Sequence, residues 1–145
     1  MTIKLNHIGF VVENIAETAK LFHTLGLREV TSTVPDPIQK VTACFMGTGE
    51  GEEAHIELLE PAGGDSPITN FLKKRGGGLH HICFEVDDIH GTTDDLIQKG
   101  YHVVVPPVDC VGYDRSFMRK TDGVTKIAFF FLSEKILIEL LQKSK

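Results

Sequence analysis

The sequence lacks the features that mark several large classes of protein. Its 145 residues carry 15 basic and 20 acidic side chains, a net charge of −5, so it has no basic surplus of the kind that binds nucleic acid. No apolar run approaches the roughly 20 residues that a membrane-spanning helix needs. The first five residues, MTIKL, have no apolar signal-peptide core and run directly into a strand pattern. We therefore expect a cytoplasmic protein with no nucleic-acid or membrane partner.

Cysteine is also scarce. Cys44, Cys83 and Cys110 are an odd number and form no CxxC motif, which argues against a disulfide framework and against a thiolate zinc site. Cys44 and Cys83 lie in apolar strand-like runs, where a free thiol packs as a small hydrophobe. The length fits one domain spanning residues 1–145 and is sufficient to bury a core.

What the sequence does contain is an internal repeat. Residues 7–15 read HIGFVVENI and residues 81–89 read HICFEVDDI, at an offset of 74 without a gap. Residues 56–59 and 138–141 are both IELL, at an offset of 82. The eight additional positions predict an insertion in the second copy, which we place in 106–114. Such a repeat predicts two copies of one structural unit.

Each copy is predicted to be a β-α-β-β-β unit. Asn14 and Asp88 are suitable N-cap residues, and Gly26 and Gly100 suit the left-handed position after a helix. The first unit, about residues 1–62, is predicted to contain a strand at 4–12, a helix at 14–25 and strands at 27–34, 39–47 and 54–60. The second unit, about 78–145, is predicted to contain a strand at 79–86, a helix at 88–99 and strands at 101–105, 115–120 and 125–132, with 135–142 as a further strand. A linker helix is expected at about 65–76, with Pro67 in its first turn.

Neither unit could bury its sheet face alone. We therefore expect an α+β fold in which the two tandem β-α-β-β-β units join into one curved, half-closed mixed sheet around a cleft. The helices are expected to pack on the outside of this sheet.

Four polar residues stand in apolar strands at positions related by the repeat: His7, Glu57, His81 and Glu139. An ionised carboxylate in such a strand is costly unless it is paired or bound to a cation. The residue two positions after each histidine, Gly9 or Cys83, is small and leaves space beside the imidazoles. A pseudo-two-fold relation between the copies would bring both His/Glu pairs into one cleft. Two imidazole nitrogens and two carboxylate oxygens suit one divalent ion, Co, Ni, Mn, Fe or Zn.

The chain resembles the vicinal oxygen chelate superfamily, which contains glyoxalases, bleomycin resistance proteins and extradiol dioxygenases. Within it the chain is most similar to methylmalonyl-CoA epimerase and to small glyoxalase I-like proteins. The segments that carry the resemblance are 6–9, 56–61, 65–68, 71–72, 78–82, 85–89 and 138–140. The resemblance implies metal ligands at His7, Glu57, His81 and Glu139, and it selects His81 over the adjacent His80, as the repeat also does.

The resemblance also implies a chemistry, which is proton abstraction next to a carbonyl. Glu139 is the first candidate for the catalytic base, and Glu57 is its equivalent in the first copy. Some epimerases of the family have a further catalytic carboxylate on the strand that follows the first helix, where this chain has Ala43. The family's proline–lysine–glycine turn before the last strand is also replaced, by FLSEK at 131–135.

Several functions therefore remain open. The first is an epimerase or isomerase of an acyl-CoA thioester; the second is a lactoylglutathione lyase acting on a glutathione thiohemiacetal. The third is a protein that binds or sequesters a small molecule, and a dioxygenase is the least favoured. A homodimer is usual in the superfamily. Less specific candidates are His55 as a neighbour of the metal site, Tyr113 and Arg115 as substrate contacts, and residues 73–75 as a phosphate contact, while His23 and His90 are expected at the surface.

Overall fold

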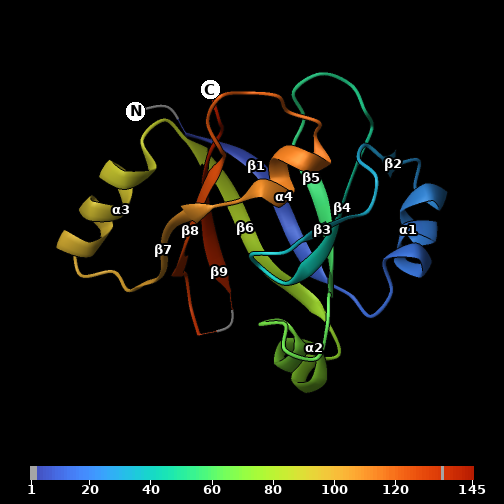
Figure 1. Ribbon diagram of the computed structural model, residues 1–145. Coiled ribbons are helices and arrows are strands. Elements are labelled where there is room, and N and C mark those ends of the chain that lie inside the picture. Colours follow the sequence, from blue (N-terminus) through green and yellow to red (C-terminus); the bar gives the residue numbers. More distant parts are fainter. Residues whose placement is uncertain (1–2, 135) are drawn as a thin grey trace.

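The computed structural model describes residues 3–134 and 136–145. Two outer helices flank a large sheet, and two shorter helices lie beside its remaining face and end (Figure 1). The elements are β1 (Ile3–Val11), α1 (Ile15–Thr24), β2 (Arg28–Glu29), β3 (Val34–Asp36), β4 (Val41–Gly47), β5 (His55–Pro61), α2 (Thr69–Arg75), β6 (Gly78–Val86), α3 (Ile89–Gln98), β7 (Val103–Asp109), α4 (Val111–Ser116), β8 (Lys126–Phe131) and β9 (Leu137–Gln142).

The sheet repeats one arrangement of strands on either side of its centre. Its order is β2-β4-β5-β1-β6-β9-β8-β7, with β3 paired to β4 outside this path. Strands β1 and β6 are antiparallel neighbours at the centre, and each has a parallel neighbour on its outer side, β5 for β1 and β9 for β6. The sheet does not close on itself. The predicted α+β class, with two units joined in one mixed sheet, is confirmed.

The caps predicted for the two long helices are present. The Asn14 side chain accepts a hydrogen bond from the Glu17 backbone N–H at 2.9 Å, and the Asp88 side chain accepts one from the Gly91 N–H at 3.0 Å. These bonds satisfy backbone donors that the first turn of a helix leaves unpaired. Beyond the helix ends, Gly26 and Gly100 have φ values of 97° and 90°, a conformation that favours glycine.

The two long helices cover the outer face of the sheet. In α1, Ile15 and Ala19 pack against Cys44, Met46 and Leu58 of the first copy. In α3, the fully buried Ile89 packs with apolar residues of the second copy, namely Val86, Ala128 and Leu140. The opposite, inner face therefore remains for the site, bordered by α4 and by the segment that leads into α2.

Two predicted strands were wrong. Residues 115–120, predicted as a strand, contain the end of α4, in which Gly112, Tyr113 and Ser116 are the buried residues. Their spacing of three and four positions is that of a helix with one face toward a core. The segment is too short for this period to be recognised in the sequence. The segment predicted to hold the insertion, 106–114, spans the end of β7 and most of α4.

The predicted strand at 27–34 is instead divided into β2 and β3. Thr31 lies between them, and its Oγ1 accepts a hydrogen bond from the Phe45 N–H at 3.0 Å. At this point the β4 backbone therefore pairs with a side chain instead of with a backbone carbonyl of a neighbouring strand. Elsewhere the predicted strands and helices agree with the structure to within a few residues. Residue 135, at the start of the last predicted strand, lies outside the described residues.

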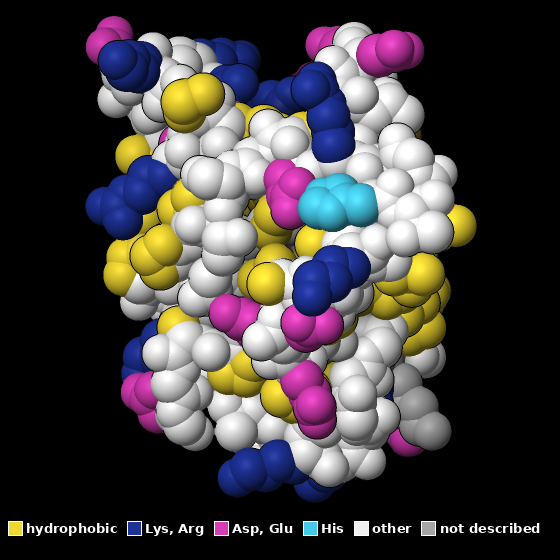
Figure 2. All heavy atoms as spheres, turned by 90° about the vertical axis from the view of Figure 1, so that its right-hand side faces the viewer, with side chains coloured by type: hydrophobic (Ala, Val, Ile, Leu, Met, Phe, Trp, Pro, Cys, Tyr) yellow, Lys and Arg dark blue, Asp and Glu magenta, His cyan; other side chains and the backbone are white. Residues whose placement is uncertain are grey.

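The surface on the α1 side of the molecule carries both signs of charge. Figure 2 shows Lys and Arg side chains intermixed with Asp and Glu side chains and with scattered apolar groups on this face. Within 3–134 and 136–145, no helix is both long and apolar enough to cross a bilayer.

Candidate metal centre

Strand pairing places the four predicted residues on the inner face of the sheet. Glu57 of β5 lies opposite Gly9 in the parallel β1–β5 pair, and Glu139 of β9 lies opposite Cys83 in the equivalent β6–β9 pair. In the central antiparallel pair, Gly9 lies opposite His81 and His7 lies opposite Cys83. Because neighbouring residues in register share a face, both His/Glu pairs point to one side. The repeat is therefore present in the strand register.

The four side chains meet at their polar ends. His7 Nε2 lies 3.0 Å from His81 Nε2, 3.2 Å from Glu57 Oε1 and 3.0 Å from Glu139 Oε1. His81 Nε2 lies 3.1 Å from Glu57 Oε1 and 3.2 Å from Glu139 Oε1. The structure thus brings together every residue that the repeat had paired.

Burial makes this arrangement costly without a cation. The relative exposure of the four residues is 9% or less. Burial raises the pKa of Glu57, but the neighbouring His7 and His81 lower it to about 2. Burial likewise opposes the charged form of His81, yet Glu139 and Glu57 raise its pKa above the ordinary value of 6.5. Without a metal, positive charge on the imidazoles therefore compensates the two carboxylates.

The donor set fits a divalent ion. Metal–ligand bonds of roughly 2.0–2.2 Å place adjacent ligand atoms about 3 Å apart, which matches the five separations. Glu139 Oε1 is buried and has no hydrogen-bond partner among the described residues, although two imidazole nitrogens lie within 3.2 Å. A bound cation would satisfy such a buried carboxylate oxygen, and the neighbouring imidazole nitrogens would be further ligands of the same ion.

A cavity of about 250 Å³ lies against this cluster. His81, Glu57 and Glu139 form part of its wall, together with apolar side chains such as Leu59, Ile68 and Phe129. A smaller space of about 30 Å³ lies on the side of His7 and Ala43. The cluster can therefore contact a small molecule that enters the larger cavity.

Asp36 is a site residue that sequence reasoning missed. It lies on β3, is only 5% exposed and lines both spaces beside the cluster. Its Oδ1 accepts hydrogen bonds from the backbone N–H groups of Ile38 and Gln39, at 2.9 and 3.1 Å. An Asp directly before Pro37, followed by such a turn, is the signal that could have indicated a fixed carboxylate.

Asp36 also places a carboxylate near the position where Ala43 lacks one. In the antiparallel β3–β4 pair, Val34 lies opposite Ala43 and Asp36 lies opposite Val41. Positions two apart along a strand share a face, so Asp36 and Ala43 are on the same side of the sheet. Ala43 itself is buried among Val11, Leu59 and Ile68, so its role is to pack the core.

The histidine that precedes His81 is also part of the site. His80 lines the larger cavity, and its Nδ1 lies 2.8 Å from His81 Nδ1. Burial, together with the charge of His81, lowers the pKa of His80 to about 4. His80 is therefore neutral near pH 7.

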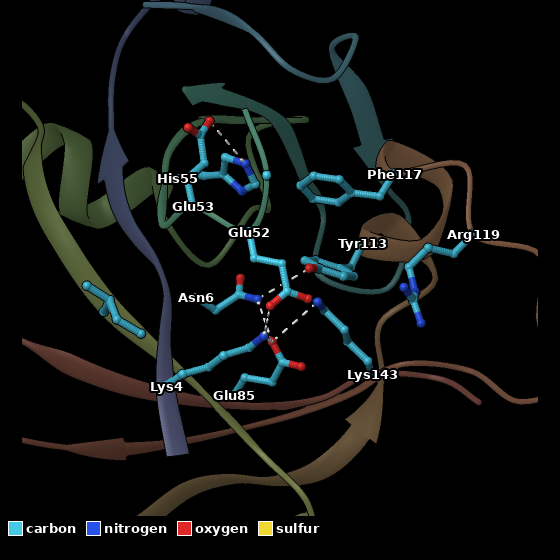
Figure 3. Close-up of a pocket in the computed structure, with 12 residues that line it drawn as sticks. Lys4, Asn6, Glu52, Glu53, His55, Glu85, Tyr113, Phe117, Arg119 and Lys143 are labelled. Carbon is cyan, nitrogen blue, oxygen red and sulfur yellow. Dashed lines mark hydrogen bonds and ion pairs between the residues drawn. The ribbon is translucent and has the colours of Figure 1, made fainter. Parts of the chain in front are cut away.

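The less specific candidates lie elsewhere or have other contacts. His55 is half-buried at a second cavity and lies 3.6 Å from Glu53, so it does not join the cluster (Figure 3). Tyr113 is buried, and its hydroxyl accepts a hydrogen bond from Asn6 Nδ2 at 3.3 Å. The remaining candidates are at the surface, namely Arg115, His23, His90 and residues 73–75. The three cysteines are buried free thiols, and this burial was expected for Cys44 and Cys83.

The fold and the site define an α+β protein with two repeated units and a His/Glu cluster on the inner face of an open sheet. Residues 6–118 match the model of the Glyoxalase/Bleomycin resistance protein/Dioxygenase superfamily. This match covers most of the sequence, and the chain belongs to that superfamily.

Three proteins illustrate the similarity. The chain is 40% identical over 104 residues to the mitochondrial methylmalonyl-CoA epimerase of Dictyostelium discoideum, covering 71% of this chain and 61% of that protein. It is 40% identical over 103 residues to the ethylmalonyl-CoA/methylmalonyl-CoA epimerase of Cereibacter sphaeroides, covering 70% and 74%. A solved structure of a single-substitution variant of Streptomyces coelicolor methylmalonyl-CoA epimerase, in complex with 2-nitronate-propionyl-CoA, has a TM-score of 0.76 and 25% identity, covering 97% and 94%. The chain thus spans about three fifths of the length of the first of these relatives.

Proposed function

We propose that this protein is a divalent-metal-dependent epimerase of a 2-carboxyacyl-CoA thioester such as methylmalonyl-CoA. The observation that carries the proposal is that three residues of the His/Glu cluster, Glu57, His81 and Glu139, line one cavity together with Asp36, a further buried carboxylate. The similarity to two epimerases and to an epimerase structure that holds an acyl-CoA analogue supports the substrate class.

The metal would be held by the four residues of the cluster, His7, Glu57, His81 and Glu139. We propose Co, Ni, Mn, Fe or Zn, since mixed imidazole and carboxylate sites suit these ions. When bound, the ion supplies positive charge that stabilises negative charge developing on the substrate carbonyl, a contribution of several kcal/mol.

Glu139 is the first proposed proton acceptor, with Glu57 as its repeat equivalent. Burial raises the pKa of Glu139, but His7 and His81 hold it well below 4.5, so the carboxylate is ionised and able to accept a proton. It would take the proton from C2 of the substrate while the C–H electron pair passes into the thioester. A well-placed base contributes roughly 10²–10⁴-fold to such a step.

Asp36 is the proposed second proton carrier. Backbone N–H groups bond its Oδ1, so the proton would be carried on Oδ2, which lies 3.4 Å from the Cys110 thiol. Inversion requires one carboxylate to accept the C2 proton while the other, already protonated, returns a proton to C2. The two carboxylates then exchange roles, so the reverse reaction restores the starting state and no other reactant is consumed.

The cavity suits the acyl end of the substrate. Its volume of about 250 Å³ is below the roughly 300–1,000 Å³ of pockets that enclose a whole drug-sized ligand. The acyl group and thioester would therefore be enclosed, while the nucleotide part of coenzyme A would lie outside.

Two assays on metal-loaded protein test this function. The first follows solvent-deuterium exchange at C2 of methylmalonyl-CoA, and the second follows product formation from methylglyoxal and glutathione. Exchange with inversion is expected, and the His81→Ala variant is expected to show neither reaction. Turnover in the second assay alone would establish the competing lyase, which needs one proton carrier. Binding of methylmalonyl-CoA without either reaction would indicate a binding protein and refute both enzyme functions.

A further inference from the structure

The central β1–β6 pair contains an irregularity before His7. Leu5 lies opposite Phe84, and His7 lies opposite Cys83, so β1 advances two residues while β6 advances one. Asn6 is the additional residue. Such a β-bulge places two consecutive residues of one strand against one residue of its partner and redirects a side chain.

The same irregularity recurs before His81, on the other strand. Gly9 lies opposite His81, and Phe10 lies opposite Leu79, so here β6 advances two residues while β1 advances one. His80 is the additional residue. Asn6 and His80 are 74 positions apart, the offset of the two histidines. The repeat therefore includes a bulge directly before each histidine.

Each bulge brings the additional residue onto its histidine. Asn6 is 8% exposed, and its Oδ1 lies 2.7 Å from His7 Nδ1. His80 Nδ1 lies 2.8 Å from His81 Nδ1. In a regular strand, consecutive side chains point to opposite faces and neither contact would form. In both copies the contact is made to Nδ1, while Nε2 faces the cluster.

The surroundings of Asn6 determine which of its atoms faces His7. Asn6 Nδ2 lies 3.3 Å from Glu85 Oε2, and the Glu85 carboxylate is held by Lys143 at 3.4 Å and by Lys4 at 3.8 Å (Figure 3). An ionised carboxylate only accepts hydrogen bonds, so the NH₂ group of Asn6 must face Glu85. Its oxygen therefore faces His7 and accepts a hydrogen bond from Nδ1–H, which leaves the Nε2 lone pair for the metal.

The second copy reaches the same result with a different acceptor. His81 Nε2 lies 3.1 and 3.2 Å from the oxygens of Glu57 and Glu139, where it is needed as a ligand. Its Nδ1 then carries the proton and donates a hydrogen bond to His80 Nδ1. The two copies therefore use an amide oxygen and an imidazole nitrogen for one task.

We propose that Asn6 and His80 are positioning residues, which the two bulges direct onto His7 and His81 to hold each imidazole in the Nδ1–H form with Nε2 toward the metal. This inference rests on the metal centre of the proposed function, but not on the substrate. Loss of such a partner of a histidine ligand typically costs 10–100-fold in metal affinity. We expect that loss for either position.

The test in the second copy uses the residue that the first copy supplies. Wild type, His80→Asn and His80→Leu are titrated with Co²⁺ against a competing chelator, and His90→Leu on the surface of α3 is the control for the same change of side chain. His80→Leu is expected to lose 10–100-fold in affinity. His80→Asn is expected to stay within a few-fold of wild type, and the control should be unchanged. Equal affinity of His80→Leu and wild type would overturn the proposal, as would an equal loss in His80→Asn and His80→Leu.

The test in the first copy examines the orientation of the Asn6 amide. Asn6→Leu should weaken Co²⁺ binding 10–100-fold, and Asn70→Leu on the exposed side of α2 is its control. The side-chain amide in Glu85→Gln can both donate and accept hydrogen bonds, so the Asn6 amide is free to turn. A smaller loss of Co²⁺ affinity is therefore expected for this variant. An unaltered affinity in both Asn6→Leu and Glu85→Gln would contradict the assignment.

A direct readout is the protonation of the two imidazoles. In ¹⁵N-labelled, Zn²⁺-loaded wild type, His7 and His81 should each show a protonated Nδ1 and a metal-bound Nε2. A proton on Nε2 of either residue would refute the proposal even if affinity changed. If wild type bound neither ion, the metal centre itself would be wrong, whereas metal binding without epimerase activity would refute only the substrate.

Discussion

Gly9 and His81 face each other across the central β1–β6 pair, and the glycine makes room for the imidazole of the other copy. A Cβ at Gly9 would lie 2.1 Å from His81 Cε1. Gly9, two positions after His7, therefore makes room for His81, and the two copies are fitted to each other at the His/Glu cluster.

Gly9→Ala is accordingly expected to displace His81 from the cluster. Overpacking of this kind typically costs about 1–3 kcal/mol of stability. We also expect Co²⁺ affinity to fall by at least about tenfold, since a ligand loses its position. Thermal unfolding and chelator competition measure the two effects. Gly64→Ala is the control, because a Cβ there meets nothing within 4 Å. A fully active, fully metal-binding Gly9→Ala protein would contradict this arrangement.

Metal removal should lower the stability of the wild type. An ion that binds only the folded state stabilises it by about 2.7 kcal/mol when present at 100 times its dissociation constant. Differential scanning calorimetry with and without Co²⁺ should show this increase in wild type. It should be nearly absent in His81→Ala, and an equal increase in both proteins would mean that the ion binds elsewhere.

The pH dependence of the metal-free protein follows from the raised pKa values of the histidines. Burial lowers the pKa of His7, but the Cys83 sulfur and the Glu57 and Glu139 carboxylates outweigh it and raise this pKa well above 6.5. Stability from such a group is fully present below the unfolded value near 6.5 and is lost as pH rises through the folded value.

Metal-free protein should therefore be less stable at an alkaline pH of about 9 than at a pH of about 6.5. Metal affinity should rise over the same range, because the ion displaces protons from the imidazoles. Denaturant titrations and chelator competition at both pH values measure these trends. Glu139→Gln should reduce the stability change, and a metal-free wild type that is more stable at the higher pH would contradict the charge arrangement.

Asp36→Asn should separate proton removal from inversion. The variant keeps the hydrogen-bonding shape of the side chain but cannot carry the proton, so epimerisation should fall by roughly 10²–10⁴-fold. Solvent deuterium should still enter C2 with retention, through the remaining base, and Co²⁺ affinity should stay unchanged. NMR of the recovered substrate and a coupled chiral assay distinguish the outcomes. Undiminished inversion would exclude Asp36 as a proton carrier.

The cluster was predictable because it depends on strand periodicity and on a repeat. His7 and Glu57 recur as His81 and Glu139, and the two central strands bring the pairs together whatever the loops do. The structure confirms this proximity, while their roles as ligands and bases stay predictions. Division of the chain into one domain is likewise still a prediction.

The positions of Asn6, His80 and Asp36 could not be predicted in this way. A β-bulge adds one residue without changing the apolar pattern enough to be noticed, and strict alternation would turn Asn6 and His80 away from the histidines that they contact. Asp36 reaches the site because β3 extends to this residue and pairs with β4 in a hairpin, whereas the predicted strand ended at residue 34. The helix at 111–116 was missed because six residues are too few for its period to be distinguished from that of a strand.

Because the proposed metal ligands are divided between the two copies, an ion bound there would report correct assembly of the fold. Each copy supplies one histidine and one glutamate, so neither copy alone presents more than half of the cluster. A slip of one residue in the β1–β6 pairing would turn His81 to the other face and abolish the centre. Binding of the proposed ion would therefore require that the two halves of the chain have docked in register.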